Sequence, residues 1–206
     1  MKEAPWLLIG GTLLVLAALL VSGVAPYDRA TWLLEVAPAA MALPILWFTR
    51  KRFPLTPMLY GFVFLHALVL IYGGAYSYAR VPLGFEIQGW FDLERNPYDK
   101  IGHLFQGLVP ALLAREILIR GHFARGPRMV GFLAVCVAMT VSAVYELIEW
   151  GVAVVAGGGA VEFLGTQGDP WDAQSDMGFA LLGAIVGLLA FSRWQTRQIQ
   201  ALSERN

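Results

Sequence analysis

Long apolar segments alternate with short polar ones along the whole chain. Residues 4–27 contain no Asp, Glu, Lys, Arg or His, and about 20 apolar residues in a helix suffice to cross a hydrocarbon core about 30 Å thick. Five further apolar segments follow, and the third of these five is apolar only after His103. The pattern predicts an all-α, polytopic membrane helix bundle with six transmembrane helices, at about residues 6–25, 31–49, 56–77, 99–119, 129–156 and 176–192.

The connections between these segments are short and carry no separate domain. Residues 78–98 hold Phe85, Trp90 and Phe91 among acidic residues, which favours a short interfacial helix or a re-entrant cap. The glycines at 157–159 are expected to end the fifth span. The first apolar segment exceeds the usual stretch of about 7–15 residues in a signal peptide, so we expect it to remain as a membrane span. Residues 1–206 are therefore predicted to form a single integral-membrane domain.

The composition fits a membrane protein and argues against other classes. Hydrophobic residues make up 57% of the chain and charged residues 15%, whereas about a quarter of the residues in soluble domains are charged. Fifteen basic and fifteen acidic residues give no net charge, so no overall positive field is available to bind nucleic acid. Cys136 is the single cysteine and lies in an apolar run, which argues against an intrachain disulfide and redox chemistry.

The basic residues predict how the helices are oriented. Lys and Arg near the ends of membrane spans stay on the cytoplasmic side. If the N terminus is cytoplasmic, eleven of the fifteen basic residues lie in segments on that side, among them Arg50, Lys51 and Arg52. We therefore predict that both termini are cytoplasmic and that residues 78–98 lie on the outer side of the membrane.

Three of the predicted spans carry a pair of ionisable residues at helical spacing. Residues three or four apart on a helix project from the same face. At a rise of about 1.5 Å per residue, all three pairs fall near the outer boundary of the hydrocarbon core. No comparable set is expected in the inner half of the bundle. The pairs are Asp99 with His103, Glu146 with Glu149, and Asp172 with Asp176.

Several carboxylates at one depth need compensation, because a charged carboxylate in hydrocarbon costs a few kcal/mol. The leading hypothesis is a site for a divalent metal ion, either Zn, Mn or Fe, because carboxylates with one imidazole suit these ions and helix bundles hold such sites by paired residues. Asp99 and Glu149 are predicted to accept protons as catalytic residues. The predicted metal ligands are His103, Glu146, Glu149, Asp172 and Asp176.

Two other interpretations of the same residues stay open. The first is a structural network in which some acids are protonated, Asp172 and Asp176 cap the last helix, and Asp99 pairs with Lys100 or Arg95. The second is a pathway for protons or cations. Such a pathway requires polar groups that continue to the cytoplasmic side, and the sequence supplies few of them there.

Single polar residues and a glycine pair complete the set of candidates. Glu35 and His66 lie in the second and third spans, where each is either a further site residue or a satisfied core residue. Gly183 and Gly187 form a Gly-x-x-x-Gly motif, which predicts close packing within the bundle or, as an alternative, a homodimer instead of a monomer.

The segments that hold the three pairs resemble a known family. They read YDKIGHL from Tyr98, YELIEW from Tyr145 and LGTQGDPWDAQSDM from Leu164. These strings look like those of the YjdF-like bacterial inner-membrane proteins, and the resemblance covers nearly the whole chain. More distantly, the order of the motifs is similar to that of VanZ-like proteins, in which amides stand at the positions of Glu149 and Asp176. The closer resemblance implies location in the bacterial inner membrane, and the remoter one implies a link to the envelope or to glycopeptide tolerance.

The position of the predicted site favours a substrate that arrives from the outer leaflet. The leading hypothesis is therefore a metal-dependent hydrolase or transferase that acts on a lipid-linked envelope molecule, with membrane lipids as its surroundings and no nucleic acid as partner. The alternatives are a small proton- or cation-coupled transporter and a non-enzymatic accessory protein. In the last case, Trp90 and Phe91 of residues 78–98 would dock an envelope partner.

Overall fold

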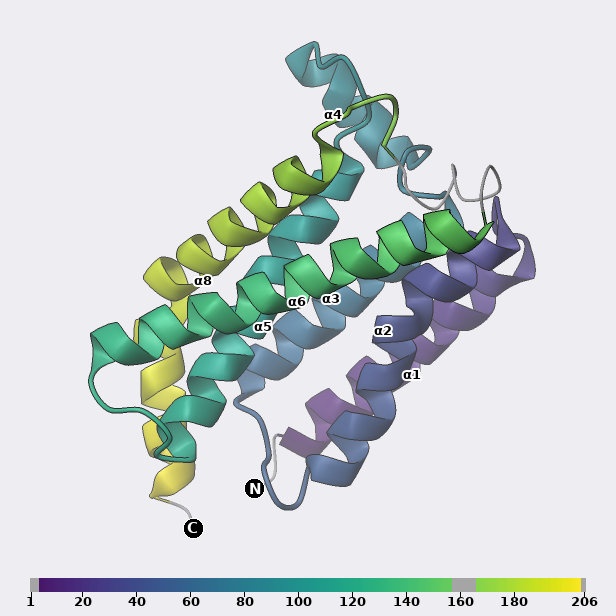
Figure 1. Ribbon diagram of the computed structural model, residues 1–206. Helices are drawn as coiled ribbons and strands as arrows, with labels where there is room; N and C mark the ends of the chain where they lie inside the picture. The colour runs from purple at the N-terminus through teal and green to yellow at the C-terminus, as the bar shows by residue number, and fades with distance from the viewer. Residues whose placement is uncertain (1–3, 157–165, 205–206) are drawn as a thin grey trace.

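The computed structural model describes residues 4–156 and 166–204, and these residues form an all-α bundle. Among the described residues, five helices are long and apolar enough to cross a membrane, namely α1, α2, α3, α6 and α8. The prediction of a polytopic membrane helix bundle is confirmed, and the glycines at 157–159 lie outside the described residues. The helices are α1 (Ala4–Val24), α2 (Arg29–Thr49), α3 (Pro57–Ala75), α4 (Pro82–Phe91), α5 (Tyr98–Arg120), α6 (Pro127–Ala156) and α8 (Asp172–Ser203) (Figure 1).

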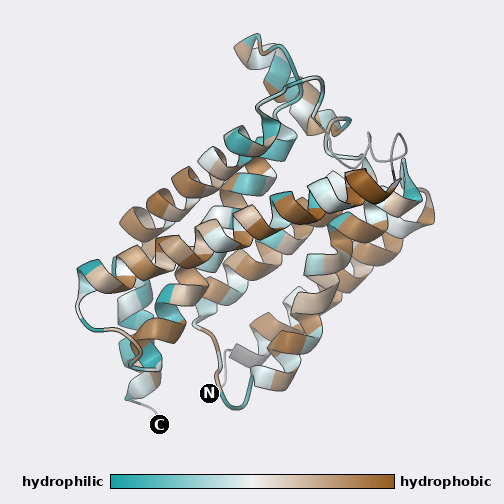
Figure 2. Ribbon diagram, in the orientation of Figure 1, coloured by the Kyte–Doolittle hydropathy of each residue, from teal (hydrophilic) through white to brown (hydrophobic). Residues whose placement is uncertain are grey.

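The bundle has two distinct ends. The start of α1 and the end of α8 lie at one end, here called the termini end, and α4 lies at the other, here called the α4 end (Figure 1). Apolar residues dominate the middle of the long helices, and polar residues gather where α5 and α8 begin (Figure 2). Large apolar side chains also face outward, such as Phe48, which is 84% exposed, and Val155, which is 90% exposed. An apolar outer surface of this kind is what lipid contact requires.

Helix α5 packs against three other helices, α3, α6 and α8. Its 23 residues span about 34 Å at the rise of an α-helix. It is absent from the five apolar helices because Asp99, Lys100, Arg115, Glu116 and Arg120 lower its hydropathy. A helix this polar is stable in lipid only when other helices surround it and pair its charges.

Glycine makes the contact between α5 and α8 close. A Cβ atom added to Gly107 would lie 1.7 Å from the backbone oxygen of Ala180, and one added to Gly183 would lie 1.9 Å from the backbone oxygen of Leu104. Gly187 faces Leu108 in the same way, at 3.0 Å from its Cγ. The predicted packing role of the Gly-x-x-x-Gly motif within the bundle is thus confirmed.

Two predictions near the ends of the helices differ from the structure. Helix α8 begins at Asp172 and runs to Ser203, well beyond the predicted 176–192. Trp171 is its N-cap residue and makes no side-chain cap hydrogen bond, so the interpretation in which Asp172 and Asp176 cap this helix is wrong. The carboxylate of Asp172 bonds instead to Arg95 and Lys100, which lie across the interface with α5.

The segment at 78–98 contains a short helix, α4, as one of the two expected forms. Its aromatic side chains are exposed, Trp90 by 69% and Phe91 by 70%. Gly84 lies against the side chain of Asn96, and Asn96 donates a hydrogen bond from Nδ2 to the backbone oxygen of Val81 over 3.0 Å. Helix α4 is therefore fastened to the loop that leads into α5.

Replacing the interface glycines by alanine tests the close contact. We expect Gly107→Ala and Gly183→Ala each to lower the free energy of unfolding by about 1–3 kcal/mol, because the added methyl group overlaps a backbone oxygen. Gly178→Ala on α8 is the matched control, since its Cβ would meet nothing within 4 Å. Thermal unfolding in detergent measures the difference. Equal melting temperatures for all three variants would contradict a close α5–α8 contact.

Candidate functional site

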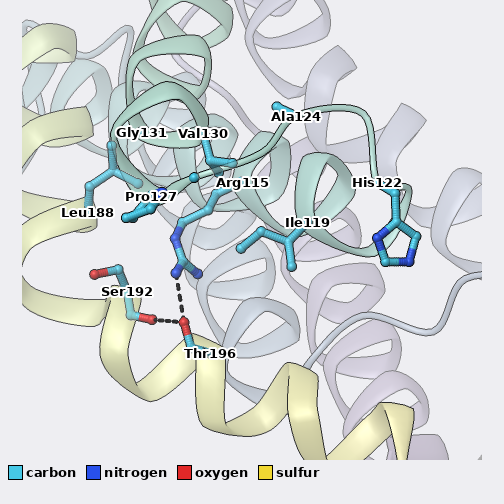
Figure 3. A pocket seen from close by; sticks show the side chains of 11 residues that line it. Arg115, Ile119, His122, Ala124, Pro127, Val130, Gly131, Leu188, Ser192 and Thr196 are labelled. Carbon is cyan, nitrogen blue, oxygen red and sulfur yellow. Dashed lines mark hydrogen bonds between the residues drawn. The ribbon is translucent and has the colours of Figure 1, made fainter.

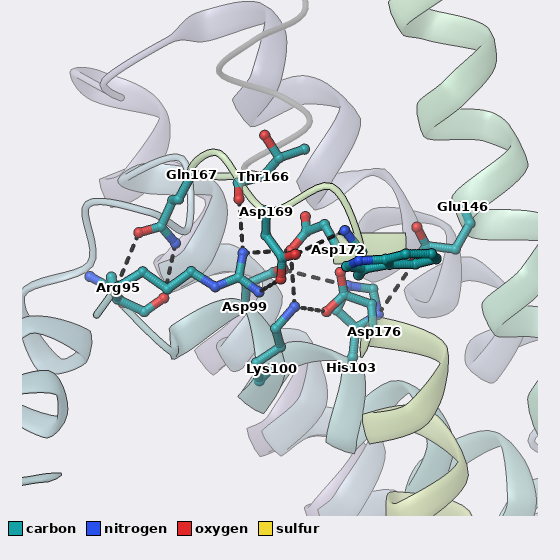
Figure 4. Close-up of polar contacts among 12 residues, drawn as sticks. Arg95, Asp99, Lys100, His103, Glu146, Thr166, Gln167, Asp169, Asp172 and Asp176 are labelled. Carbon is teal, nitrogen blue, oxygen red and sulfur yellow. Dashed lines mark hydrogen bonds and ion pairs between the residues drawn. The ribbon is translucent and has the colours of Figure 1, made fainter. Parts of the chain in front are cut away.

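The predicted residues on α5 and α8 meet at the α4 end, where both helices begin (Figure 4). Asp99 and His103 come from the first turns of α5, and Asp172 and Asp176 come from the first turns of α8. Glu146 reaches the same cluster from α6. Side chains separated by up to 77 positions in the sequence are therefore neighbours, as the helical spacing of the pairs predicts.

Three of these residues form a compact group of possible metal ligands. One ligand atom from each of Asp99, His103 and Asp176 lies within 4.8 Å of the others. The Nε2 atom of His103 is 3.4 Å from Oδ1 of Asp99 and 3.8 Å from Oδ1 of Asp176. His103 and Asp176 are buried, with 5% and 2% of their surfaces exposed. The imidazole thus directs one nitrogen at two carboxylates that come from different helices.

The other nitrogen of His103 faces a different pair of residues. Its Nδ1 atom is 3.0 Å from Oε1 of Gln106 and 3.8 Å from Oε1 of Glu146. Glu146 therefore lies across the ring from Asp99 and Asp176. Its Oε1 atom is buried and has no hydrogen-bond partner among the described residues. Burying an acceptor without a hydrogen bond costs free energy, and a proton or a cation bound to this carboxylate would remove that cost.

Glu149 lies one turn further along α6 and is half-buried. It interacts electrostatically with Glu146 and Asp99, but it is not part of the three-residue group. Its roles as a metal ligand and as a proton acceptor stay predictions.

Two basic residues compensate the aspartates of α8 and of the loop before it. Lys100 Nζ is 2.6 Å from Oδ1 of Asp176 and 3.0 Å from Oδ1 of Asp172. Arg95 contacts Asp172 over 2.8 Å and Asp169 over 2.6 Å (Figure 4). Among the described residues Asp99 makes neither of the ion pairs expected for it, with Lys100 or Arg95, because both basic side chains turn toward α8.

The loop before α8 is held against the loop before α5 by polar contacts that sequence analysis missed. Gln167 donates from Nε2 to the backbone oxygen of Asn96 over 2.9 Å, and its Oε1 accepts from the backbone N–H of Asn96 over 3.1 Å. Arg95 also donates to the backbone oxygen of Thr166 over 2.8 Å. Gln106 was missed as well, since a glutamine one turn after a histidine is not distinctive. The resemblance of the segment from Leu164, which contains Gln167, to a known family was the one sequence feature that could have drawn attention to this loop.

Glu35 and His66 lie outside the three-residue group. Tyr145 donates a hydrogen bond from its hydroxyl to Oε2 of the buried Glu35 over 2.8 Å, which links α6 to α2. His66 stacks on Phe105 with 6.1 Å between ring centroids. Glu35 thus behaves as a satisfied buried acid beside the site, and His66 contacts the core of the bundle.

A second polar network contradicts the expectation that the other half of the bundle holds nothing comparable. Glu116 is fully buried near the termini end of α5 and accepts hydrogen bonds from the backbone and the hydroxyl of Thr56, over 2.9 and 2.7 Å. Arg120 pairs with the same carboxylate over 2.9 Å, and Gln195 donates to it over 3.3 Å. Sequence analysis did not single out Glu116, because it lies among basic residues at the end of a predicted span.

An apolar layer separates the two polar networks. On α5 the side chains between Gln106 and Arg115 are all apolar, over about 14 Å of helix. On α8 the side chains between Asp176 and Ser192 are also apolar, and the glycine contact brings the two backbones together in this layer. The described parts of α5 and α8 therefore offer no chain of polar groups from one end to the other.

The ion pairs of Lys100 generate a stability prediction. We expect Lys100→Met to lower the free energy of unfolding by roughly 3 kcal/mol, because it leaves two buried aspartates without their shared cation. Adding Asp176→Asn should recover part of this loss. Lys51→Met, at an exposed lysine, is the control and should change stability by less than about 0.5 kcal/mol. Unfolding by sodium dodecyl sulfate in mixed micelles with a metal chelator measures these effects, and a fully stable Lys100→Met variant would contradict them.

Comparisons with known proteins agree with this architecture. A family model described as "Predicted membrane protein (DUF2238)" matches residues 7–197. The chain is also 53% identical over 196 residues to the inner membrane protein YjdF of Escherichia coli (strain K12), a match that covers 95% of this chain and 94% of that relative. No solved structure matches the chain. The predicted location in the bacterial inner membrane is confirmed by this similarity and by the membrane-spanning helices.

Proposed function

Because the chain belongs to the DUF2238 family of membrane proteins and gathers acids around one imidazole, we propose that it is a metal-dependent hydrolase or transferase of the inner membrane. The observation that carries this proposal is the group of Asp99, His103 and Asp176, whose ligand atoms lie within 4.8 Å of one another. The divalent ion is Zn²⁺, Mn²⁺ or Fe²⁺, each of which accepts imidazole and carboxylate ligands.

The surroundings of His103 support a metal at its Nε2 atom. Histidine ligands usually donate the N–H of their other ring nitrogen to a carboxylate or carbonyl oxygen, which fixes the ring. Gln106 Oε1 lies 3.0 Å from Nδ1 and supplies that acceptor. Asp99 and Asp176 flank Nε2, so the metal would lie between α5 and α8.

The balance of charge also favours a cation at this site. Five carboxylates approach one another here, and among the described residues the lysine and arginine side chains that pair with them are those of Arg95 and Lys100. These two residues compensate the negative charges of Asp169 and Asp172. The Oε1 atom of Glu146 has no hydrogen-bond partner among the described residues. A divalent cation would offset the remaining negative charge more completely than the imidazole of His103 alone. Asp172, predicted as a ligand, serves in this proposal to hold Lys100 and Arg95.

A bound metal would lower the pKa of a coordinated water and polarise an ester or phosphoester oxygen. The residue that accepts the proton of that water must lie close to the metal and keep a carboxylate oxygen that does not coordinate it. Asp99, at 17% side-chain exposure, and Glu149, on the adjacent helix, are the two candidates. Glu146 faces Nδ1 on the other side of the ring, so its role as a metal ligand stays a prediction and is not part of this proposal.

We also propose the membrane orientation that makes the α4 end the outer face. Helix α5 is the sixth span in this arrangement, since it is as long as the others and is enclosed by α3, α6 and α8. Most basic residues then lie at the termini end, which is cytoplasmic by the preference of Lys and Arg for that side. The site then lies at the end of the bundle nearest the outer leaflet, and a lipid-linked envelope molecule is the substrate class that we propose for it there.

The alternatives have weaker support. A proton or cation pathway needs polar groups across the bundle, and the apolar layer on α5 and α8 interrupts them. An accessory protein would use the exposed Trp90 and Phe91 of α4 to dock an envelope partner. This last function leaves the buried acids of the cluster without a role.

Elemental analysis of the purified protein tests the metal site. We expect about one divalent ion per chain after purification with Zn²⁺, Mn²⁺ and Fe²⁺ supplied, and at least a tenfold lower content in Asp176→Asn and in His103→Gln. Asp172→Asn is the matched control, because it removes an aspartate of the same helix that is outside the group. A metal-free wild-type protein, or full metal content in Asp176→Asn, would overturn the proposal. If the metal is present, hydrolysis of an envelope lipid extract by the same variants tests the reaction.

Labelling of introduced cysteines tests the orientation. In a Cys136→Ser background, we expect a membrane-impermeant maleimide to label Trp90→Cys in intact spheroplasts and to label Lys51→Cys only after lysis. Both positions are exposed, at opposite ends of the bundle. The reverse pattern would place the site on the cytoplasmic side and would rule out a substrate from the outer leaflet.

A further inference from the structure

A cavity lies at the termini end, far from the aspartate and histidine cluster. Its volume is about 520 Å³, and it is bordered by the end of α5, the beginning of α6, the loop between them and α8 (Figure 3). The residues that line it include Arg115, Ile119, Val130, Gly131, Leu188 and Thr196. Apolar and basic side chains therefore share one cavity, so an occupant needs both an anionic and an apolar part.

Arg115 supplies a fixed positive charge in this cavity. Its guanidinium donates to Oε1 of Gln195 over 2.8 Å. It also donates to the hydroxyl of Thr196 over 2.7 Å (Figure 3). Gln195 is itself fully buried and bonded to the backbone of Leu112, so the guanidinium is held in place by the bundle. Two of its five N–H donors are used in this way, which leaves three to bind an anion.

The nearest carboxylate does not neutralise Arg115. Glu116, the next residue on α5, pairs with Arg120 and accepts from Thr56. Among the described residues Arg115 has no ion pair with a carboxylate. Two further basic residues, Arg125 and Arg128, are neighbours in sequence of the lining residues Ala124, Gly126 and Pro127. The local field therefore favours an anion.

The opposite wall of the cavity is apolar. Ile119, Val130 and Leu188 come from three different helices, and Val137 and Leu189 expose apolar side chains further along α6 and α8. A free phosphate ion gains nothing from such a wall, whereas a phospholipid places its phosphate near the arginine and its acyl chains along the helices. Basic pockets between membrane helices bind anionic headgroups in this manner.

We propose that this cavity binds the phosphate headgroup of an anionic phospholipid, with Arg115 as the residue that holds the phosphate. Charge-assisted hydrogen bonds from an arginine to a phosphate are stronger than neutral ones and are directional. Ser192 and Thr196 line the same side of the cavity, and the apolar wall directs the acyl chains into the bilayer. The site is independent of the aspartate and histidine cluster and of any reaction there.

Native mass spectrometry of the full-length protein in detergent tests this site, with dioleoyl phosphatidylglycerol and dioleoyl phosphatidylcholine as probes. We expect one tightly bound phosphatidylglycerol, and binding at least about tenfold weaker in Arg115→Gln, as the loss of charge-assisted hydrogen bonds implies. Gly131→Leu should weaken it as well, because its side chain fills the cavity without changing the charge and its Cβ meets nothing within 4 Å.

Two matched controls separate this cavity from general effects. Lys51→Gln removes a basic residue elsewhere at the same end, and Gly10→Leu adds the same side chain on α1 at a position with equal space. Both should bind phosphatidylglycerol like the wild type. If Arg115→Gln fails to fold, Gly131→Leu alone decides the question. Three results would each overturn the proposal. They are wild-type binding of phosphatidylglycerol by Gly131→Leu, binding of phosphatidylcholine as tight as that of phosphatidylglycerol, and displacement of the lipid by inorganic phosphate at a concentration on the order of 10 mM.

Discussion

The arrangement of the bundle depends on burying α5, a helix that is too polar to face lipid. Its charged residues lie at its two ends, and each charge must find a partner on a neighbouring helix because hydrocarbon offers none. The close contact at Gly107 and Gly183 satisfies this requirement by bringing the backbones of α5 and α8 together. The other helices then supply the apolar surface that surrounds the pair.

This burial concentrates chemistry at both ends of α5 and excludes it from the middle. At the α4 end, carboxylates outnumber the available basic residues, and a histidine lies among them. At the termini end, Glu116 is the single buried acid among the described residues, and its carboxylate is hydrogen-bonded to Thr56 and paired with Arg120. The ligands that we propose, a cation at the first end and an anion at the second, follow this difference in charge.

Helical spacing predicted much of the α4 end but could not fix how the helices rotate relative to each other. The pairs on α5 and α8 meet because both begin at the same depth. Glu146 approaches Nδ1 of His103, whereas Asp99 and Asp176 approach Nε2, since the rotation of α6 depends on packing that no local pattern records. Arg95 was named with Asp99 as its partner, but it pairs with Asp169 and Asp172 instead. Gln167 was missed because it lies in a loop, and Glu116 was missed because one acid among basic residues at the end of a span forms no distinctive pattern.

The case for a metal site at the α4 end, instead of a protonated structural cluster, depends on which carboxylates have no lysine or arginine partner. Lys100 and Arg95 bond to Asp169, Asp172 and one oxygen of Asp176. Asp99 and Glu146 remain around His103, together with Oδ1 of Asp176, which Lys100 also contacts. Glu146 lies on the Nδ1 side of His103, where its buried Oε1 has no hydrogen-bond partner among the described residues. Asp99 and Asp176 lie on the Nε2 side, at 3.4 and 3.8 Å, and it is between these two carboxylates and the imidazole that we propose the divalent ion.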